Sequence, residues 1–346
     1  MNVLISITHP ATAHQFYRII QLLKDRNHKV TVLVIKKDRN WEVFDDYGIE
    51  YKVIGNTTGK NKLDKAFIVL ISTFKHLYWG IRTRADVYIG IPTPMMSLAA
   101  FLTRKKNIAF CDTERSTEAL WFAKKFSYKI ITPKLYRTDI GKKQIRLDTF
   151  KELFYLHPKY FKPNAEDLKL VGLKKGENFT FVRFVAWNAS HDIGYKGFSD
   201  EEKMKLIKHL EKYGKVLVSS EEELPPKFNK YIVKVPHTKI HSIMSFAQLF
   251  VGDGLTMAFE CNVMGIHAVF TSELTSGASD EFENVYKLLY PITDRENMLK
   301  KTIEKTTQLL EDKNLQKEGR RKLEKLLKEK IDINEWWVNY LEKEVK

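Results

Sequence analysis

The sequence has very few cysteines. Only Cys111 and Cys261 occur among its 346 residues. Two thiols cannot form a disulfide framework, and they cannot supply the thiolate cage of a structural zinc site. Because unpaired thiols are typical of a reducing compartment, this composition favours a cytoplasmic protein.

Long hydrophobic runs are also missing. The strongest one, Ala66–Phe74, ends after nine residues at Lys75, whereas a helix needs about 20 apolar residues to span a bilayer. The N-terminus has no basic region followed by a cleavable apolar segment, and residues 3–7 instead favour a first buried strand. We therefore expect neither a membrane-spanning helix nor a secretory signal.

Glycine and proline are not enriched. The chain has 16 Gly and 10 Pro, with 43% hydrophobic and 29% charged residues, which are ordinary values for a globular protein. This composition argues against a disordered or fibrous chain. At about 150 residues for each domain, the length corresponds to one large or two ordinary domains.

Acidic residues are scarce in one half of the chain. Residues 1–165 carry 29 Lys and Arg but only 14 Asp and Glu, whereas residues 166–346 carry 29 of each. The whole net charge of +15 therefore lies in the first half. An anionic partner for that half would be a phosphorylated substrate, a nucleic acid or an acidic membrane surface, and a merely solubilising surface is the alternative. Because no recognised nucleic-acid-binding motif occurs, we do not expect nucleic acid as the partner.

Short apolar runs alternate with helix-like segments along the chain. In the first half a helix is expected over 13–26, and the expected strands are 3–7, 30–35, 87–91 and 108–112. In the second half a helix is expected over 199–213, and the expected strands are 179–187, 216–221, 231–235, 249–253 and 267–271. Such alternation is typical of parallel βαβ units with helices on both faces of a sheet. We therefore predict an α/β protein with two Rossmann-like, doubly wound domains.

The predicted boundary between these domains lies at residue 163. The segment His157–Asn164, HPKYFKPN, places two prolines in a short polar and aromatic connection, which is typical of a linker. The first domain would then cover residues 1–163 and the second residues 164–330.

The end of the chain is predicted to be helical. A long charged helix is expected from Asp294 to about Lys330, followed by residues 331–346. This last segment contains Trp336 and Trp337, whose large apolar rings need cover. We expect the last helix to cross back and pack on the first domain.

The first candidate site follows the first strand, in SITHPATAHQFYRII. A loop between a strand and a helix is where parallel α/β sheets place ligands, and this one contains His9 and His14. A helix N-terminus can hold an anion, and His14 can act as a base or donate to a phosphate. The alternative is that each histidine is a hydrogen-bonded structural residue. No glycine separates Ile7 from the helix, so the loop is neither a dinucleotide fingerprint nor a P-loop.

Polar residues also follow the strand at 108–112. Asp112, Thr113 and Glu114 lie at its carboxyl end, which is a favourable place for a site. The alternative is that Asp112 or Thr113 caps the next helix.

Two strand ends in the second half carry further candidates. The segment 183–197, RFVAWNASHDIGYKG, combines a cation, an aromatic ring, a hydroxyl and an acid–base pair in Arg183, Trp187, Ser190 and His191–Asp192. These side chains could bind a nucleotide or an acceptor, or His191 and Asp192 could form only a turn. At the end of the next strand, Ser219, Ser220 and Glu221 occupy the corresponding position, with a helix cap and a solvated acidic loop as the preferred alternative.

The sharpest pattern is the turn Gly252–Asp253–Gly254, which lies between a strand and a helix entered through Thr256 and Met257. A glycine-rich turn allows backbone amides to approach a pyrophosphate at a helix N-terminus, where the helix dipole favours negative charge. An acidic residue in such a turn is unusual beside phosphates. Asp253 would have to point away or pair with a cation, or else the donor phosphates do not bind in this position.

Glu260 follows Gly254 by six residues, and Gly265 closes the helix before the next strand. At this interval the carboxylate could accept hydrogen bonds from the two hydroxyls of a ribose. The alternative is a glutamate in the first helical turn, where it would favour the helix dipole.

Together these features resemble the glycosyltransferase-B (GT-B) superfamily, whose members have two Rossmann-like domains facing a cleft and a C-terminal helix that returns to the first domain. More closely, the chain resembles a prokaryotic family known as domain of unknown function number 354. The resemblance covers nearly the whole chain, through SITHPATAHQF, FCDTE, YLHPKYFKP, RFVAWNASHD, VSSE and GDGLTMAFECNVMG.

The superfamily resemblance implies a nucleotide-sugar donor on the second domain and an acceptor on the first. It would place Gly254, Thr256 and Met257 at the donor phosphates, Glu260 at the ribose and His14 at the reaction centre. The lipid-linked N-acetylglucosaminyltransferase of peptidoglycan synthesis has the same glycine-to-glutamate interval. Its first loop, however, is glycine-rich.

The resemblance thus implies a glycosyltransferase that transfers a sugar from a nucleotide sugar, expected to be UDP-linked, to a phosphate- or lipid-linked acceptor in cell-surface glycan synthesis. His14, or failing that Asp112 or His191, would deprotonate the acceptor. No metal site and no cofactor are expected, and the basic half suggests peripheral contact with the inner face of an anionic membrane. The alternative is a UDP-N-acetylhexosamine 2-epimerase or hydrolase on the same fold, although the Arg-Pro-Glu entry loop of the non-hydrolysing epimerases is replaced by Thr8-His9-Pro10.

Overall fold

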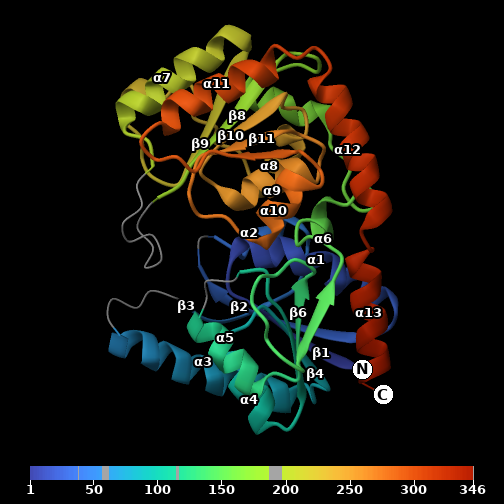
Figure 1. Cartoon of the computed structure of the whole chain (residues 1–346). Helices are drawn as coiled ribbons and strands as arrows, with labels where there is room; N and C mark the ends of the chain where they lie inside the picture. Colours follow the sequence, from blue (N-terminus) through green and yellow to red (C-terminus); the bar gives the residue numbers. More distant parts are fainter. Residues whose placement is uncertain (38, 57–61, 114–116, 187–196, 346) are drawn as a thin grey trace. The chain divides into compact units, whose positions relative to one another are not determined.

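The computed structural model describes residues 1–37, 39–56, 62–113, 117–186 and 197–345 (Figure 1). The chain divides into two compact units. The first consists of Met1–Tyr155 together with Lys330–Lys346, and the second of Leu156–Glu329. The first unit thus ends at Tyr155, eight residues before the predicted domain boundary at residue 163 and before the proline-containing segment.

The first unit is built on a seven-stranded, fully parallel sheet with the strand order β3-β2-β1-β4-β5-β6-β7. Its strands are β1 (Asn2–Ile7), β2 (Lys29–Lys36), β3 (Lys52–Asn56), β4 (Val87–Gly90), β5 (Lys106–Phe110), β6 (Lys129–Pro133) and β7 (Gln144–Leu147). The central strands are continuous apolar runs because helices cover both faces of the sheet.

Helices lie between most successive strands of the first unit, as in a doubly wound fold, and two more follow the last strand along the chain. They are α1 (Pro10–Asp25), α2 (Glu42–Asp46), α3 (Lys62–Arg82), α4 (Pro94–Leu102), α5 (Thr117–Phe126), α6 (Leu153–Leu156) and α13 (Ile333–Glu344). The core includes Leu4, Leu33, Tyr88 and Ala109, all fully buried.

The C-terminal helix α13 belongs to the first unit and packs against α1. Figure 1 shows it (red) beside the N-terminal strands (blue), with the two chain termini close together. The ring of Trp337 is fully buried and lies 5.9 to 6.1 Å from the rings of Phe16, Phe110 and Phe154. This apolar cluster explains why the boundary lies close after Phe154, because the ring of Phe154 packs in the core of the first unit.

The second unit has a five-stranded parallel sheet with the strand order β12-β11-β10-β8-β9. Its strands are β8 (Phe179–Phe184), β9 (Lys215–Ser220), β10 (Leu249–Gly252), β11 (Ala268–Phe270) and β12 (Leu289–Pro291). Its α-helices are α7 (Asp200–Leu210), α8 (His237–Met244), α9 (Leu255–Asn262), α10 (Gly277–Asn284), α11 (Met298–Leu310) and α12 (Leu315–Glu329), and its 3₁₀ helices are η1 (Ala165–Val171), η2 (Glu211–Tyr213) and η3 (Pro226–Phe228).

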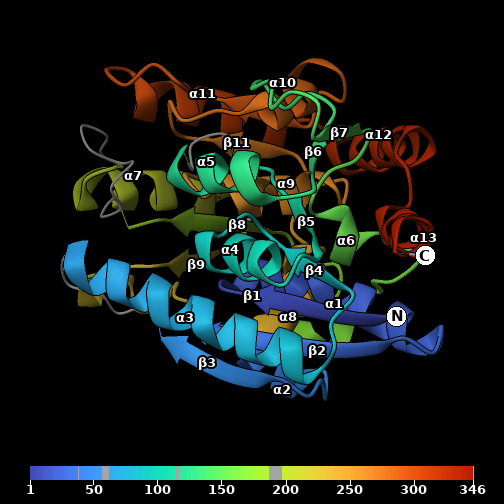
Figure 2. The same cartoon turned by 90° about the horizontal axis from the view of Figure 1, so that it is seen from below.

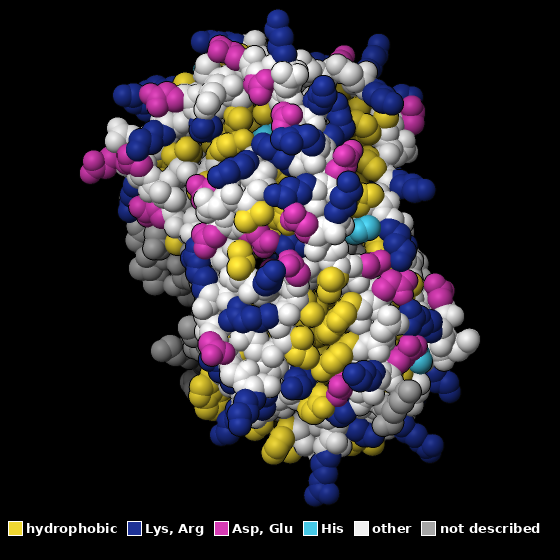
Figure 3. Space-filling model, turned by 45° about the vertical axis from the view of Figure 1, so that its right-hand side comes forward, with side chains coloured by type: hydrophobic (Ala, Val, Ile, Leu, Met, Phe, Trp, Pro, Cys, Tyr) yellow, Lys and Arg dark blue, Asp and Glu magenta, His cyan; other side chains and the backbone are white. Residues whose placement is uncertain are grey.

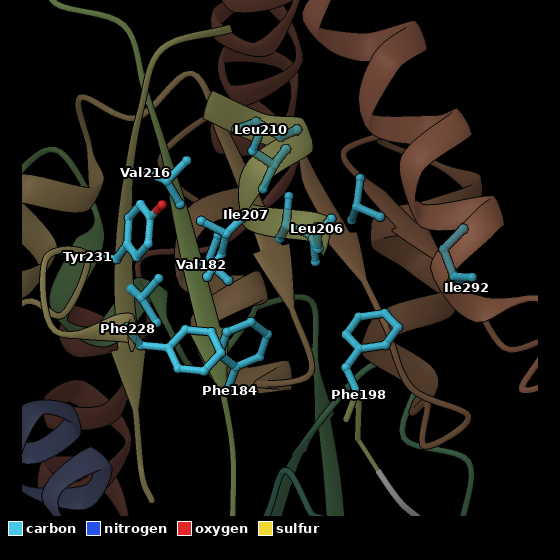
Figure 4. Packing of buried hydrophobic residues seen from close by; sticks show 14 of the residues in the cluster. Val182, Phe184, Phe198, Leu206, Ile207, Leu210, Val216, Phe228, Tyr231 and Ile292 are labelled. Atoms are coloured by element: carbon cyan, nitrogen blue, oxygen red, sulfur yellow. The ribbon is translucent and has the colours of Figure 1, made fainter. Parts of the chain in front are cut away.

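The core of the second unit packs β8 and β9 against α7 and α11. Figure 4 shows the rings of Phe184, Phe228 and Phe198 below the aliphatic side chains of Val182 and Ile207. The two parallel sheets with their alternating helices confirm the predicted α/β, doubly wound class.

Several sequence predictions of single elements were wrong. Residues 231–235 form only an isolated bridge between Ile232 and Val218 and no strand. The predicted long helix after Asp294 is two helices, α11 and α12, separated by residues 311–314. The short or polar strands β3, β6, β7 and β12 were not predicted, because their sequences lack the long apolar run on which that prediction depends.

Two buried histidines should make stability depend on pH. Burial lowers the pKa of His76 in the first unit and of His267 in the second unit to about 4. The unfolded chain takes up these protons near pH 6.5, so the free energy of unfolding falls as the pH drops from 6.5 towards 4.

We expect a loss of about 2 kcal/mol for each histidine between pH 7 and pH 5, measured by urea unfolding at both pH values. His76→Gln should remove its share of this pH dependence, and the exposed His237→Gln is the matched control. If the unfolding free energy of His76→Gln depends on pH as strongly as that of the unchanged protein, His76 does not contribute to the pH dependence.

Candidate functional site

Each sheet contains a point at which the strand order reverses. In the second unit the neighbours β8 and β10 are followed by chain that leaves toward opposite edges of the sheet. In the first unit the same holds for β1 and β4. Open parallel α/β sheets bind ligands outside the carboxyl ends of the strands at such a switch point. The candidate residues of Gly252–Glu260 and of His9–His14 follow β10 and β1, respectively.

The turn after β10 requires glycine. Gly252 has φ +154°, and a Cβ atom there would lie 2.1 Å from the carbonyl oxygen of Arg183 on β8. At Gly254 a Cβ atom would lie 2.7 Å from Cγ of Arg183. The absence of side chains thus brings the backbone after β10 against the end of β8.

Gly252→Ala should therefore destabilise the second unit by about 3 kcal/mol or more, because the new methyl group collides with backbone and φ stays positive. The matched control is Gly176→Ala, where φ is +92° but nothing lies within 4 Å. It should cost only about 1 kcal/mol. The measurement is chemical denaturation of both variants, and equal losses would mean that close packing at Gly252 is unimportant.

Helix α9 begins directly after this turn. Gly254 is its N-cap residue in an extended conformation, and no side chain caps the helix at that position. Thr256 and Met257 in the first turn are half-buried. The first amides of a helix have no partners within the helix, and the helix dipole adds partial positive charge. The start of α9 therefore has the geometry of an anion site.

Asp253 lies in this turn, and its carboxylate has a defined partner. Its Oδ1 accepts a hydrogen bond of 2.9 Å from the backbone amide of Val185, just after β8. The side chain is buried. This bond orients the carboxylate toward the end of β8, so Asp253 ties the two strand ends together.

Arg183 crosses the ends of three strands. Its side chain begins against Gly254. Its guanidinium donates to Ser219 Oγ at 2.7 Å and to Glu221 Oε1 at 2.5 Å, both at the end of β9. The second oxygen of Glu221 accepts a bond of 3.1 Å from the amide of Ala186. This network places a partly exposed cation beside the start of α9, and Ser220 lies next to it, half-buried.

Glu260 lies deeper in α9. It is the sixth residue of the helix, so the alternative of a dipole interaction in the first turn is wrong. Its Oε1 lies 3.0 Å from Nε2 of His241 on α8, and both side chains are buried. Because a buried carboxylate is costly without partners, His241 stabilises Glu260 in this position. Gly265, which ends the turn after α9, has φ +78°.

In the first unit, the two predicted histidines have different environments. His9 is the exposed N-cap residue of α1, and its Nδ1 accepts a bond of 3.2 Å from the amide of Ala11. His14 is the fifth residue of α1 and is buried, with its ring 5.6 Å from the ring of Tyr155. His9 thus has a capping role, as the structural alternative supposed.

Asp112 and Thr113 follow β5. Asp112 forms an ion pair of 2.6 Å with Lys151, which also lies 3.7 Å from the buried Glu152. Thr113 is exposed, and its hydroxyl lies 3.4 Å from Asp112 Oδ1. Helix α5 is described from Thr117, and residues 114–116, which precede it, lie outside the described residues. The helix-cap alternative therefore stays a prediction.

Five predicted site residues lie outside the part of the chain that the structure describes: Glu114, Trp187, Ser190, His191 and Asp192. Two residues of the candidate sites were missed from the sequence: Lys151 in the first unit and His241 in the second. His241 and Glu260 are 19 positions apart on different helices, so no local spacing connects them. Ser219 was predicted together with Ser220 and Glu221, and its hydroxyl lies 2.7 Å from the guanidinium of Arg183.

No three His, Cys, Asp or Glu side chains within the described ranges are grouped closely enough to hold a metal ion. Around the start of α9, backbone amides, the guanidinium of Arg183 and the buried carboxylate of Glu260 occur together.

No family model matches the chain, and no curated protein does. Solved structures do match over nearly the whole length. Together with the two sheet topologies, they define the chain as a protein of the GT-B fold with two Rossmann-like domains.

Three of these structures, two glycosyltransferases and one epimerase, illustrate which proteins share the fold. A spinosyn forosaminyltransferase has a TM-score of 0.66 at 12% identity, with 100% of this chain and 99% of that chain covered. A glycosyltransferase from Streptomyces sp. SF2575, complexed with thymidine diphosphate, has a TM-score of 0.64 at 12% identity, with 99% of each chain covered. The UDP-GlcNAc 2-epimerase from Neisseria meningitidis, bound to UDP-GlcNAc, has a TM-score of 0.62 at 12% identity, with 92% of this chain and 94% of that chain covered.

Proposed function

We propose that this protein is a glycosyltransferase that transfers a sugar, without a metal ion, from a nucleotide-sugar donor to a phosphate- or lipid-linked acceptor. The observation that carries the proposal is the start of α9. There an uncapped helix N-terminus at the switch point is followed on the same helix by the buried carboxylate of Glu260. A helix N-terminus of this kind suits the phosphates of a nucleoside diphosphate, and a carboxylate suits the hydroxyls of its ribose.

In this proposal the donor pyrophosphate lies at the amides of Thr256 and Met257. The helix dipole and the guanidinium of Arg183 offset its negative charge. Asp253 is compatible with this arrangement, since its Oδ1 is held by the Val185 amide. Glu221 keeps Arg183 at the strand ends, where the cation can stabilise the phosphate charge that develops as the sugar leaves.

Glu260 would accept hydrogen bonds from the ribose hydroxyls. A carboxylate can accept several bonds at once, so its contact with His241 is compatible with a bound ribose. His241 fixes the position of the carboxylate before the nucleotide arrives, which lowers the entropic cost of binding.

Transfer needs a base for the acceptor hydroxyl, and His14 is the proposed one. The acceptor oxygen forms a bond to the anomeric carbon, the bond from that carbon to the diphosphate breaks, and the acceptor proton passes to His14. A neutral imidazole suits this role near neutral pH.

A second candidate is a UDP-N-acetylhexosamine 2-epimerase or hydrolase. The structural similarity to the Neisseria meningitidis epimerase supports this candidate about as strongly as the similarity to the two glycosyltransferases supports a transferase. The loop Thr8-His9-Pro10 favours the transferase. It replaces the Arg-Pro-Glu entry loop of the non-hydrolysing epimerases, and its His9 caps α1.

The test begins with calorimetric titration of UDP, thymidine diphosphate and their sugar conjugates into the full chain. Binding of any of them with a 1:1 ratio is the expected result, and binding of none would overturn the proposal. The second step incubates the bound nucleotide sugar with and without lipid phosphates. Release of nucleoside diphosphate that depends on the acceptor identifies a transferase, whereas conversion of UDP-N-acetylhexosamine alone identifies the epimerase.

A further inference from the structure

Helix α3 of the first unit exposes its apolar face. Phe67, Phe74 and Ile81 are 62%, 61% and 64% exposed, and Leu70 and Tyr78 are also more than half exposed. They recur every three or four residues, so they form one stripe along the helix. A surface helix of a globular protein normally turns such a stripe toward the core.

The fully buried side chains of α3 are polar, and their contacts fix this orientation. His76 is fully buried, and its Nε2 lies 2.8 Å from Ser6 Oγ on β1. Its Nδ1 lies 2.7 Å from the carbonyl oxygen of Ser72. At Gly80 a Cβ atom would lie 1.7 Å from the hydroxyl of Tyr88, so the helix approaches the sheet through glycine. Turning the stripe inward would break these contacts.

The apolar surface continues on the neighbouring helices. Figure 2 shows α3, α4 and α5 side by side, and α4 packs against both of the others. Phe101 and Leu102 at the end of α4 are 58% and 59% exposed, and Trp121 on α5 is also more than half exposed. The rings of Phe101 and Phe126 lie 5.2 Å apart and connect α4 with α5. We call the exposed apolar residues of α3, α4 and α5 the apolar face: Phe67, Leu70, Ile71, Phe74, Tyr78, Ile81, Phe101, Leu102 and Trp121.

Basic residues surround the apolar face. Residues 62–129 contain 12 Lys and Arg against 5 Asp and Glu. Among the described side chains of this segment, the exposed basic ones are Lys75, Arg82, Arg84, Arg104, Lys105, Lys124 and Lys125. Figure 3 turns the side of α12 and α13 forward and not that of α3, and in its lower part, too, hydrophobic side chains (yellow) reach the surface among Lys and Arg (dark blue). The ammonium group of Lys125 lies over the ring of Trp121, 5.3 Å from the ring centroid.

We propose that the apolar face docks on the surface of an anionic lipid bilayer. Exposed apolar patches of this kind mark interaction sites. A bilayer takes up an apolar stripe to a depth of about 5–10 Å while basic side chains reach its anionic headgroups. Tyr78 and Trp121 suit the interface, where one end of the ring is apolar and the other polar.

The charge pattern selects the bilayer over a protein partner. Lys and Arg come from α3, from α5 and from the turns that follow α3 and α4, and they outnumber acidic side chains. The surface therefore offers one sign of charge around an apolar centre. An anionic bilayer presents the complementary arrangement over its whole area. No described helix has both the length and the apolarity needed to cross a bilayer, so contact takes place at the surface. Such docking is independent of the proposed transferase activity.

The test is co-sedimentation of the full chain with vesicles of phosphatidylcholine alone or mixed with phosphatidylglycerol. We expect binding to the mixed vesicles that weakens with rising salt, and little binding to phosphatidylcholine. Leu70→Ser with Phe74→Ser should weaken binding to the mixed vesicles tenfold or more. Lys75→Gln with Lys124→Gln should weaken it by about fivefold for each residue.

Matched controls come from the second unit. Leu170→Ser with Val285→Ser replaces two other exposed apolar residues, and Lys205→Gln with Lys212→Gln replaces two other exposed lysines. Both should bind like the unchanged protein. All substituted side chains are exposed, so thermal unfolding should shift little.

Three results would overturn the proposal. The unchanged protein could fail to sediment with either vesicle, or the Leu70 and Phe74 variant could bind as well as the unchanged protein. Light scattering could also show a dimer that this variant dissociates while vesicle binding is unaffected, which would assign the apolar face to a second copy of the chain.

Discussion

Replacing Glu260 by glutamine is expected to weaken nucleotide binding by about tenfold to a hundredfold. The side chain keeps its volume, but two charge-assisted hydrogen bonds from ribose hydroxyls become neutral, and such bonds to charged groups contribute about 1.5–3 kcal/mol each. The effect should be similar for a free nucleoside diphosphate and for its sugar conjugate, because the ribose is common to both. Calorimetric titration measures it directly.

The matched control is Glu281→Gln, which removes another buried carboxylate from the second unit. It should leave nucleotide affinity unchanged. Replacing His241 by glutamine should weaken binding less than Glu260→Gln, because it loosens the carboxylate without removing it. Unchanged affinity in Glu260→Gln would move the nucleotide away from α9 and contradict the proposed donor site.

His14→Ala is expected to lower kcat by a factor of about 10²–10⁴ while leaving nucleotide affinity unchanged. A general base contributes to the transition state and not to donor binding, so its loss appears in kcat. The measurement is steady-state transfer with saturating donor, together with calorimetric titration of the nucleoside diphosphate.

His9→Ala is the neighbouring control. It removes the cap of α1, so about 0.5–2 kcal/mol of stability should be lost with little change in kcat. His14→Gln separates chemistry from packing, because it keeps a side chain beside Tyr155 without a basic nitrogen. If both His14 variants turn over normally, the base lies elsewhere, and Asp112 and His191 are the next residues to replace.

The sequence predicted those elements whose signal is local. The runs at 3–7, 30–35 and 249–253 correspond to β1, β2 and β10 because continuous β-branched and aliphatic residues fit strands buried on both faces. The turn Gly252–Gly254 was also recognisable, since a positive φ at Gly252 excludes most other residues. Short strands such as β12, with three residues, gave no such signal.

The candidate site was predictable only in part. The spacing of Gly254 and Glu260 along one helix is a local property, and the structure places them on α9 as the pattern suggested. The partners of these residues were not predictable. In the second unit His241 contacts Glu260, and in the first unit Lys151 contacts Asp112. Each of these pairs joins distant segments, and such partners leave no spacing in the sequence.

The orientation of α3 shows the same division. Its sequence has an apolar run with Lys and Arg at both ends, which fits a buried helix as well as a helix on a membrane surface. Only the tertiary contacts show which face of the helix is buried, because His76 pairs with Ser6 and Gly80 packs on Tyr88.

By itself, then, the sequence determined the α/β class, the glycine turn before α9 and the location of the excess positive charge, because composition, periodicity and backbone freedom act over a few residues. The tertiary structure alone decided the strand orders that create the two switch points, the burial of Trp337 in the first unit and the pairing of Glu260 with His241. These features depend on which distant segments exclude water from one another, and that free energy is a property of the packed chain and not of any local stretch.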